Sequence, residues 1–237
     1  MRPLPRHPAR RHGHAGFSLT DLLMVAATVS LLAAVVVPLV SRFRSQSRIA
    51  QCTANLQQLS KAVTLYANEN DGRLPELTNA PAPGGWWHYR EQVKGYLGLR
   101  GAASPEETVF GCPSDRGYGD EAGRPVPFRL DRKHLFTSYV FNGVNHVPGL
   151  PNIAGRQLSS LRNPARTLLV LEWTAHAPLS WHRSRTGRAN TPFYNNAESV
   201  VAFADGRVAL IPIHHDGLNP AYTRDPVNGY AYQFSGE

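Results

Sequence analysis

The sequence predicts an α+β fold in which one long N-terminal helix packs on a small antiparallel β-sheet. Three observations lead to this prediction. An apolar run over residues 16–40 follows a basic leader. An apolar stripe at helical spacing runs from residue 49 to residue 66, and four strand-like segments follow residue 137. One helix followed by a run of strands is typical of a two-layer α+β domain.

The apolar run is long enough to cross a membrane. Residues 17–40 are 24 residues with one charged side chain, Asp21. At about 1.5 Å per residue they make a helix of roughly 36 Å, against a hydrocarbon core of about 30 Å. The leader before them holds four arginines and no acid, so we expect it to stay cytoplasmic and the following residues to be exported. A cleaved secretory signal peptide is disfavoured because no A-x-A site occurs in residues 24–40.

Asp21 is costly inside an apolar helix, by about 2.5 to 3.5 kcal/mol on insertion scales. We therefore expect it to pair with a cation. The free amine of Phe17 on a neighbouring copy would be such a cation once the chain is cut after Gly16. In the alternative interpretation, Asp21 belongs to an ordinary signal anchor and reaches the lipid headgroups from the membrane interface.

The composition indicates one globular domain outside the membrane and argues against nucleic-acid binding. The chain has 42% hydrophobic and 18% charged residues, an ordinary balance for a folded domain. Of its net charge of +8, four units belong to the leader arginines, so the remainder carries +4. That surplus is mild and spread out, which does not suit a nucleic-acid interface.

The long helix is expected to run from Phe17 to about Asn68. Pro38 should kink or loosen it, because proline has no N–H group to donate. Beyond Pro38 one face is apolar and the other polar, with Asn55 on the polar face, and Gly72 supplies the left-handed cap at the end. The apolar face consists of Ile49, Cys52, Leu56, Leu59, Val63 and Tyr66.

The middle of the chain is expected to be loops around one short helix before Gly98. The aromatic residues of that helix should pack in the core. The loop over residues 113–127 contains three acids, Asp115, Asp120 and Glu121, which are weak calcium candidates. Their spacing does not match the EF-hand loop pattern, so a solvated acidic loop is the favoured interpretation. No C-x-x-C motif or Cys/His cluster predicts a zinc site, and no other cofactor is expected.

Four segments have the β-branched and aromatic content of strands. They cover residues 138–142, 167–173, 199–204 and 207–213. Asp205-Gly206 predicts a hairpin with a type I′ turn between the last two segments. Residues 214–237 show no period and are expected to lie irregularly on the surface.

The two cysteines, Cys52 and Cys112, should both lie on the outer side of the membrane, where disulfides persist. A bond between them would close a loop of about 60 residues and contribute on the order of 4 kcal/mol in the chain-entropy model. Two separate buried thiols are the alternative, since pairing cannot be proved from sequence.

The start of the apolar run, Gly16-Phe17-Ser18-Leu19-Thr20-Asp21, resembles the class III signal of type IV pilins and type II secretion pseudopilins. In that family a prepilin peptidase cuts after the glycine and methylates the new N-terminal phenylalanine. The acid at the fifth mature position is nearly always glutamate in the family, and here it is Asp21. A helix-loosening proline is common where this chain has Pro38.

Further stretches resemble the pseudopilin-like families of planctomycetes and verrucomicrobia that carry an H-x9-D-G signature. This chain has Asp205-Gly206 at the D-G pair but Asn195 at the position of the histidine. The other matching stretches are Cys52-Thr-Ala-Asn-Leu-Gln-Gln-Leu, Tyr66-Ala-Asn-Glu-Asn-Asp-Gly-Arg-Leu-Pro, Cys112-Pro-Ser-Asp and Ser138-Tyr-Val-Phe-Asn.

The resemblance implies a non-enzymatic structural subunit of a pilus-like or pseudopilus filament. The implied parts are a cleaved leader over residues 1–16, a transmembrane and assembly helix over 17–40, and a periplasmic domain over 41–237. The implied partners are the prepilin peptidase, other pilin or pseudopilin subunits, the inner-membrane assembly platform and membrane lipid.

Two other classes of function stay open at this stage. A signal-anchored extracytoplasmic enzyme would have to use His214-His215-Asp216 or residues 180–182, yet no common catalytic motif is present and surface histidines are the favoured interpretation. A glycan-binding module would need exposed aromatic residues. Its candidates are Trp86, Trp87, Trp173 and Trp181.

Overall fold

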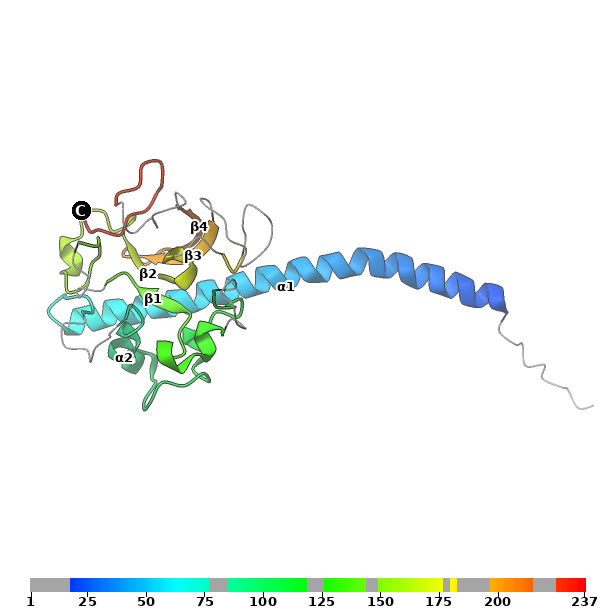
Figure 1. Cartoon of the computed structure of the whole chain (residues 1–237), viewed down its shortest axis with the longest axis horizontal. Helices are drawn as coiled ribbons and strands as arrows, with labels where there is room; N and C mark the ends of the chain where they lie inside the picture. The colour runs from blue at the N-terminus through cyan, green and yellow to red at the C-terminus, as the bar shows by residue number, and fades with distance from the viewer. Residues whose placement is uncertain are drawn as a thin grey trace, which may run out of the picture. The chain divides into compact units, whose positions relative to one another are not determined.

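The computed structural model describes residues 18–76, 85–118, 126–143, 149–176, 180–182, 197–214 and 225–237. The chain divides into two compact units, Met1–Arg44 and Ser45–Glu237. The N-terminal helix α1, Leu19–Glu69, is a single element that crosses the boundary between them (Figure 1).

Helix α1 has 51 residues and ends one residue beyond the predicted end. The amide of Gly72 donates to the carbonyl oxygen of Ala67 at 2.8 Å, and Gly72 has φ of 77°. This left-handed residue closes the last turn, as the sequence predicts, because glycine adopts positive φ without a steric penalty.

The outer half of α1 contributes its apolar face to the core of the second unit. Cys52, Leu56, Leu59 and Val63 are fully buried, while Ile49 and Tyr66 at the two ends of the stripe are half-buried. The prediction for Asn55 was wrong, because its side chain is buried on the same face as the apolar residues. Asn55 follows Cys52 by three residues, which places both side chains on one side of the helix.

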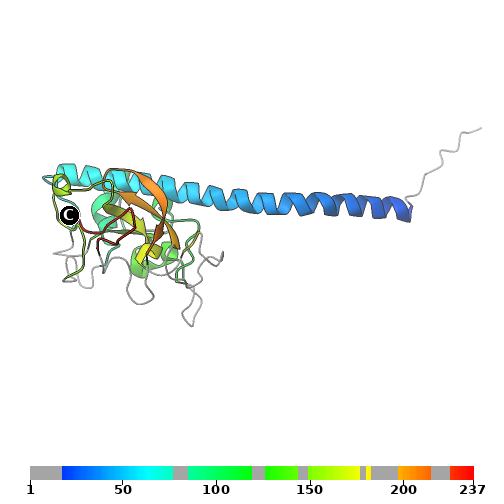
Figure 2. The same cartoon turned by 90° about the horizontal axis from the view of Figure 1, so that it is seen from above.

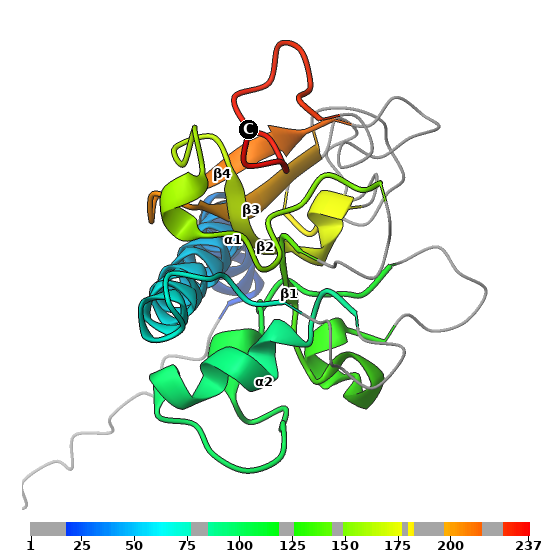
Figure 3. The same ribbon diagram turned by 90° about the vertical axis from the view of Figure 1, so that its left-hand side faces the viewer.

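The sheet has four antiparallel strands in chain order, β1-β2-β3-β4. The cyan outer half of α1 lies along this sheet (Figures 1 and 3), so the predicted α+β architecture is confirmed. Strands β1 and β2 are buried throughout, as expected for strands covered on both faces. The strands are β1 Tyr139–Phe141, β2 Leu168–Glu172, β3 Ala197–Phe203 and β4 Val208–Ile213.

The β3–β4 hairpin forms at Asp205-Gly206, but the predicted type I′ turn was wrong. Gly206 has φ of 88°, while Asp205 is not among the residues with positive φ. The amide of Gly206 donates to the carbonyl oxygen of Phe203 at 3.0 Å, and the amide of Phe203 donates to that of Arg207 at 2.8 Å. This pattern is that of a type I turn followed by a left-handed glycine, the usual longer hairpin loop. Figure 2 shows the hairpin in orange.

The predicted short helix is present as α2, Tyr89–Val93, followed by a 3-10 turn over Lys94–Leu97. Gly98 ends it with φ of 74°. Tyr89 and Val93 are buried and join the main core, which confirms that this aromatic segment packs inward.

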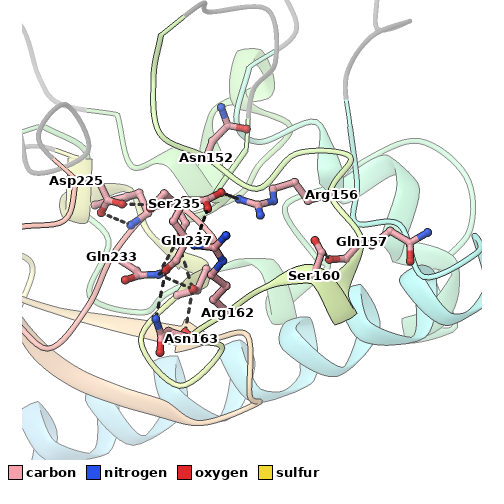
Figure 4. Close-up of polar contacts among 12 residues, drawn as sticks. Asn152, Arg156, Gln157, Ser160, Arg162, Asn163, Asp225, Gln233, Ser235 and Glu237 are labelled. Atoms are coloured by element: carbon pink, nitrogen blue, oxygen red, sulfur yellow. Dashed lines mark hydrogen bonds and ion pairs between the residues drawn. The ribbon is translucent and has the colours of Figure 1, made fainter.

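The predicted surface position of the C-terminal segment was wrong for residues 225–237. Tyr232 and Phe234 are almost fully buried, and Gln233 pairs with Thr167 beside β2. The carboxylate of Asp225 accepts the amide of Ser235 at 2.8 Å (Figure 4). The Gln233 side chain donates to the carbonyl oxygen of Glu237 at 2.7 Å. The pairing of Gln233 with Thr167 joins segments 66 residues apart in the sequence, so no local pattern could predict it.

Candidate functional site

The first part of α1 carries a predominantly apolar surface that nothing in the described chain covers. Leu31 is 71% exposed and Val35 is 64% exposed. Among the described residues α1 is the one helix long and apolar enough to cross a membrane, judged by length and composition. Exposure of so much apolar surface to water is unfavourable, so lipid or other protein must cover this segment. Its other exposed large apolar side chains include Leu19, Leu22, Leu23, Met24, Val29, Leu32, Val36, Val37 and Leu39.

The hydroxyl groups inside the apolar segment have partners within the helix. Thr28 Oγ1 donates to the carbonyl oxygen of Val25 at 2.9 Å, and Ser30 Oγ donates to that of Ala26 at 2.7 Å. A hydroxyl that is satisfied within its own helix needs no water, so these two residues suit an apolar environment.

Asp21 lies in the first turn of α1 and forms a capping box with Ser18. The Ser18 amide donates to Asp21 Oδ2 at 3.0 Å, and the Asp21 amide donates to Ser18 Oγ at 3.2 Å. The two side chains satisfy two of the amide groups that a helix start leaves without partners. This arrangement was not predicted from the sequence, although Ser-x-x-Asp before an apolar run is the motif that indicates it.

The capping box leaves the Asp21 carboxylate available to a second partner. The residue is exposed, and a carboxylate has acceptor positions on both oxygens. Gly16 and Phe17 lie outside the described residues. The pairing of Asp21 with the Phe17 amine of another copy therefore stays a prediction.

Pro38 lies inside α1 without ending it. The helix continues for 31 residues beyond this position, from Leu39 to Glu69. Proline cannot donate to the carbonyl oxygen four residues earlier, which is that of Ala34. The helix therefore has one fewer backbone hydrogen bond at this point, which lowers the cost of bending it there.

Cys52 and Cys112 are joined by a disulfide in the structure, with their Cα atoms 5.0 Å apart. This separation lies in the range that a disulfide requires. Next to it, Asn55 Nδ2 donates to the carbonyl oxygens of Thr108 at 3.1 Å and Gly111 at 2.9 Å. The bond and the two hydrogen bonds together attach the loop before β1 to helix α1.

Asp115 is not part of a solvated acidic loop, so that interpretation was wrong for this residue. It is 3% exposed. Its carboxylate accepts the amides of Gly117 and Arg129, each at 2.8 Å, and the hydroxyl of Ser138 at 2.7 Å. Burial raises the pKa of the Asp115 carboxyl, although these hydrogen bonds favour the charged form. Asp120 and Glu121 lie outside the described residues, so calcium binding stays untested.

Of the residues proposed for the alternative functions, those that the structure describes are buried or half-buried. The expectation of surface histidines was wrong for His182, whose side chain is 1% exposed and whose Nε2 lies 2.9 Å from Glu172 Oε1. Its imidazole is therefore engaged by Glu172 instead of activating the Ser180 hydroxyl, which donates to the Glu198 carbonyl oxygen. His215, Asp216 and Asn195 lie outside the described residues.

The aromatic side chains offered for glycan binding do not form an exposed platform. Trp181 is 1% exposed and Trp173 is 8% exposed. Their indole N–H groups donate to the carbonyl oxygens of Gly117 and Thr137, at 3.1 Å and 3.0 Å. Trp86 and Trp87 are half-buried. These rings therefore serve the core, as aromatic side chains usually do.

A distant relative was found among proteins of known function. The chain is 30% identical over 103 residues to the type IV major pilin protein PilA of Myxococcus xanthus. The match covers 41% of this chain and 46% of PilA, so the chain spans about half the length of that protein. No family model matches the chain, and no solved structure matches it. Together with the α+β fold, the similarity supports a pilin-like structural protein anchored by its N-terminal helix.

Proposed function

We propose that this chain is a structural subunit of a type IV pilus-like or type II secretion pseudopilus filament, assembled through its N-terminal helix. The observation that carries the proposal is the exposed apolar segment of α1 with Asp21 in its first turn. The lipid bilayer covers this segment before assembly, and neighbouring copies cover it afterwards. The similarity to a major pilin supports the same conclusion.

The proposal places the chain in the inner membrane with the second unit in the periplasm. The four leader arginines favour a cytoplasmic N-terminus. Arg42, Arg44 and Arg48 follow the apolar segment and are exposed, so they oppose this bias in part. Because long exported domains translocate largely regardless of their charge, the leader decides the orientation.

The proposal includes cleavage by a prepilin peptidase between Gly16 and Phe17 and methylation of Phe17. The junction lies between the basic leader and the apolar run, where a membrane-embedded peptidase would reach it. Cleavage is also required by the proposed pairing, since it creates the amine that Asp21 would bind.

We expect Gly16→Leu to leave the full-length precursor in the membrane, because a leucine side chain at the cleavage junction would obstruct the peptidase. Gly13→Leu is the matched control, since it changes another leader glycine and should leave cleavage intact. Intact-mass measurement of the purified protein decides the outcome. Complete processing of the Gly16→Leu variant would contradict the proposed cleavage site.

A further inference from the structure

Four side chains with metal-ligating atoms meet in the core of the second unit. They are Cys52 of α1, Cys112 of the loop before β1, Glu172 at the end of β2, and His182. Their ligand atoms all lie within 4.8 Å of one another. Cys52, Cys112 and Glu172 are fully buried, and the His182 side chain is 1% exposed. We propose that these four side chains bind a zinc ion when Cys52 and Cys112 are thiols instead of a disulfide.

The donor atoms suit zinc in type and number. Two thiolates, one imidazole nitrogen and one carboxylate oxygen make a four-ligand set of the kind that binds zinc tetrahedrally. Bond lengths of about 2.0 to 2.3 Å place the ligand atoms of such a site about 3.3 to 3.8 Å apart. The present set needs a contraction of roughly 1 to 1.5 Å at most, together with separation of the two sulfurs, which lies within the reach of side-chain rotation.

Glu172 is held in an orientation that suits a ligand. Its Oε2 accepts the amide of Val200 at 2.8 Å, which fixes the carboxylate, and its Oε1 faces His182 Nε2 at 2.9 Å. In the zinc-bound state the neutral imidazole would carry its proton on Nδ1, which leaves Nε2 and the carboxylate oxygen available to the ion. Hydrogen bonds to a ligating carboxylate from outside the site are typical of metal centres.

A buried carboxylate–imidazole pair beside a disulfide is weak evidence for a stabilising role in the core. Replacement of a buried ion pair by apolar side chains is often neutral or stabilising, because charged groups lose their hydration on burial. A zinc site gives these two residues a role in the dithiol state of the same chain.

Metal binding and disulfide formation exclude each other. Zinc binding to the dithiol releases two protons, one from each thiol. A disulfide-donating oxidant then takes two electrons from the two thiolates. The sulfurs form the Cys52–Cys112 bond, the oxidant is reduced to two thiols by taking up two protons, and Zn²⁺ is released.

Both the zinc site and the disulfide would connect α1 to the loop before β1. The outer half of the helix therefore stays attached to the second unit in both states. This inference does not depend on filament assembly.

The test uses the full-length chain in detergent, reduced with a phosphine and titrated with Co²⁺ as a spectroscopic probe. We expect a thiolate-to-cobalt charge-transfer band that saturates at one cobalt per chain and disappears when Zn²⁺ displaces the probe. The oxidised chain should show no band. If the metal-free dithiol chain loses structure, zinc should restore the circular dichroism of the oxidised chain. A reduced chain that binds no cobalt and gains no structure from zinc would overturn the proposal.

Two variants separate the four-ligand site from adventitious binding by thiols. Glu172→Gln and His182→Asn should each weaken cobalt binding at least about tenfold. Their oxidised forms, checked by circular dichroism, show whether they fold. His88→Asn is the matched control, since His88 is half-buried outside the cluster. Unchanged cobalt affinity in both folded variants would show that the thiols alone hold the metal and would overturn the proposal.

Discussion

Asp21→Ala is expected to abolish incorporation into filaments, or to reduce it at least about tenfold, while the subunit still inserts into the membrane and is cleaved. The carboxylate costs about 2.5 to 3.5 kcal/mol in the bilayer. In the proposed assembly it gains a cationic partner, the Phe17 amine of another copy. Alanine removes this driving force, and about 1.4 kcal/mol already corresponds to a factor of ten. The amount of subunit in sheared filaments, relative to the membrane fraction, measures the effect.

The capping box provides a control that separates the charge of Asp21 from its role in starting the helix. Ser18→Ala removes the hydroxyl that accepts the Asp21 amide but keeps the carboxylate. It should weaken the helix start by about 1 kcal/mol and leave incorporation nearly unchanged. Asp21→Glu should also be tolerated. Equal loss of incorporation in Ser18→Ala and Asp21→Ala would mean that capping, and not charge pairing, explains the requirement for Asp21.

The second large effect is expected from removal of the disulfide. The bond spans 60 residues and is worth about 4 kcal/mol in the chain-entropy model. The double variant Cys52→Ala with Cys112→Ala should therefore unfold about 8 to 16 °C lower than the oxidised chain, since 1 kcal/mol shifts the midpoint of a domain this size by about 2 to 4 °C. Thermal unfolding followed by circular dichroism, in a buffer with a chelator, measures the difference.

The thermal comparison requires that the Cys52–Cys112 disulfide is present in the protein as isolated. Peptide mapping without reductant should recover one peptide pair linked through Cys52 and Cys112. If both thiols react with an alkylating reagent in unreduced, denatured protein, the bond is absent and the predicted loss of stability has no basis.

The features that the sequence predicts well depend on local patterns. The long helix follows from its apolar run and from a stripe at steps of three and four residues, and Gly72 ends it because few other residues adopt its positive φ. The hairpin at Asp205-Gly206 was found for the same reason. The predicted turn type was wrong because an Asp-Gly pair permits two loop geometries. They differ in whether Asp205 also adopts positive φ.

The features that sequence analysis missed depend on contacts between distant segments. Glycines surround Asp115 in the sequence, which predicted a solvated position, yet Ser138 and Arg129 supply two of its three donors from outside its own loop. The ligands of the proposed zinc site come from four separate segments, so no spacing rule could bring them together. The capping box of Ser18 is an exception, since the Ser-x-x-Asp motif that indicates it is local and can be recognised in the sequence.

Photo-crosslinking in cells can show whether copies of this chain assemble through their apolar helices. A photoreactive amino acid at Val29, which is 58% exposed, would capture whatever covers the apolar segment. Leu130, which is 48% exposed in the second unit, is the control position. We expect crosslinking at Val29 to give a ladder of multiples of the subunit mass. The ladder should be much weaker from Leu130 and should be lost in Asp21→Ala. If Val29 gives only monomers and lipid adducts in cells that make filaments, the copies do not assemble through these helices.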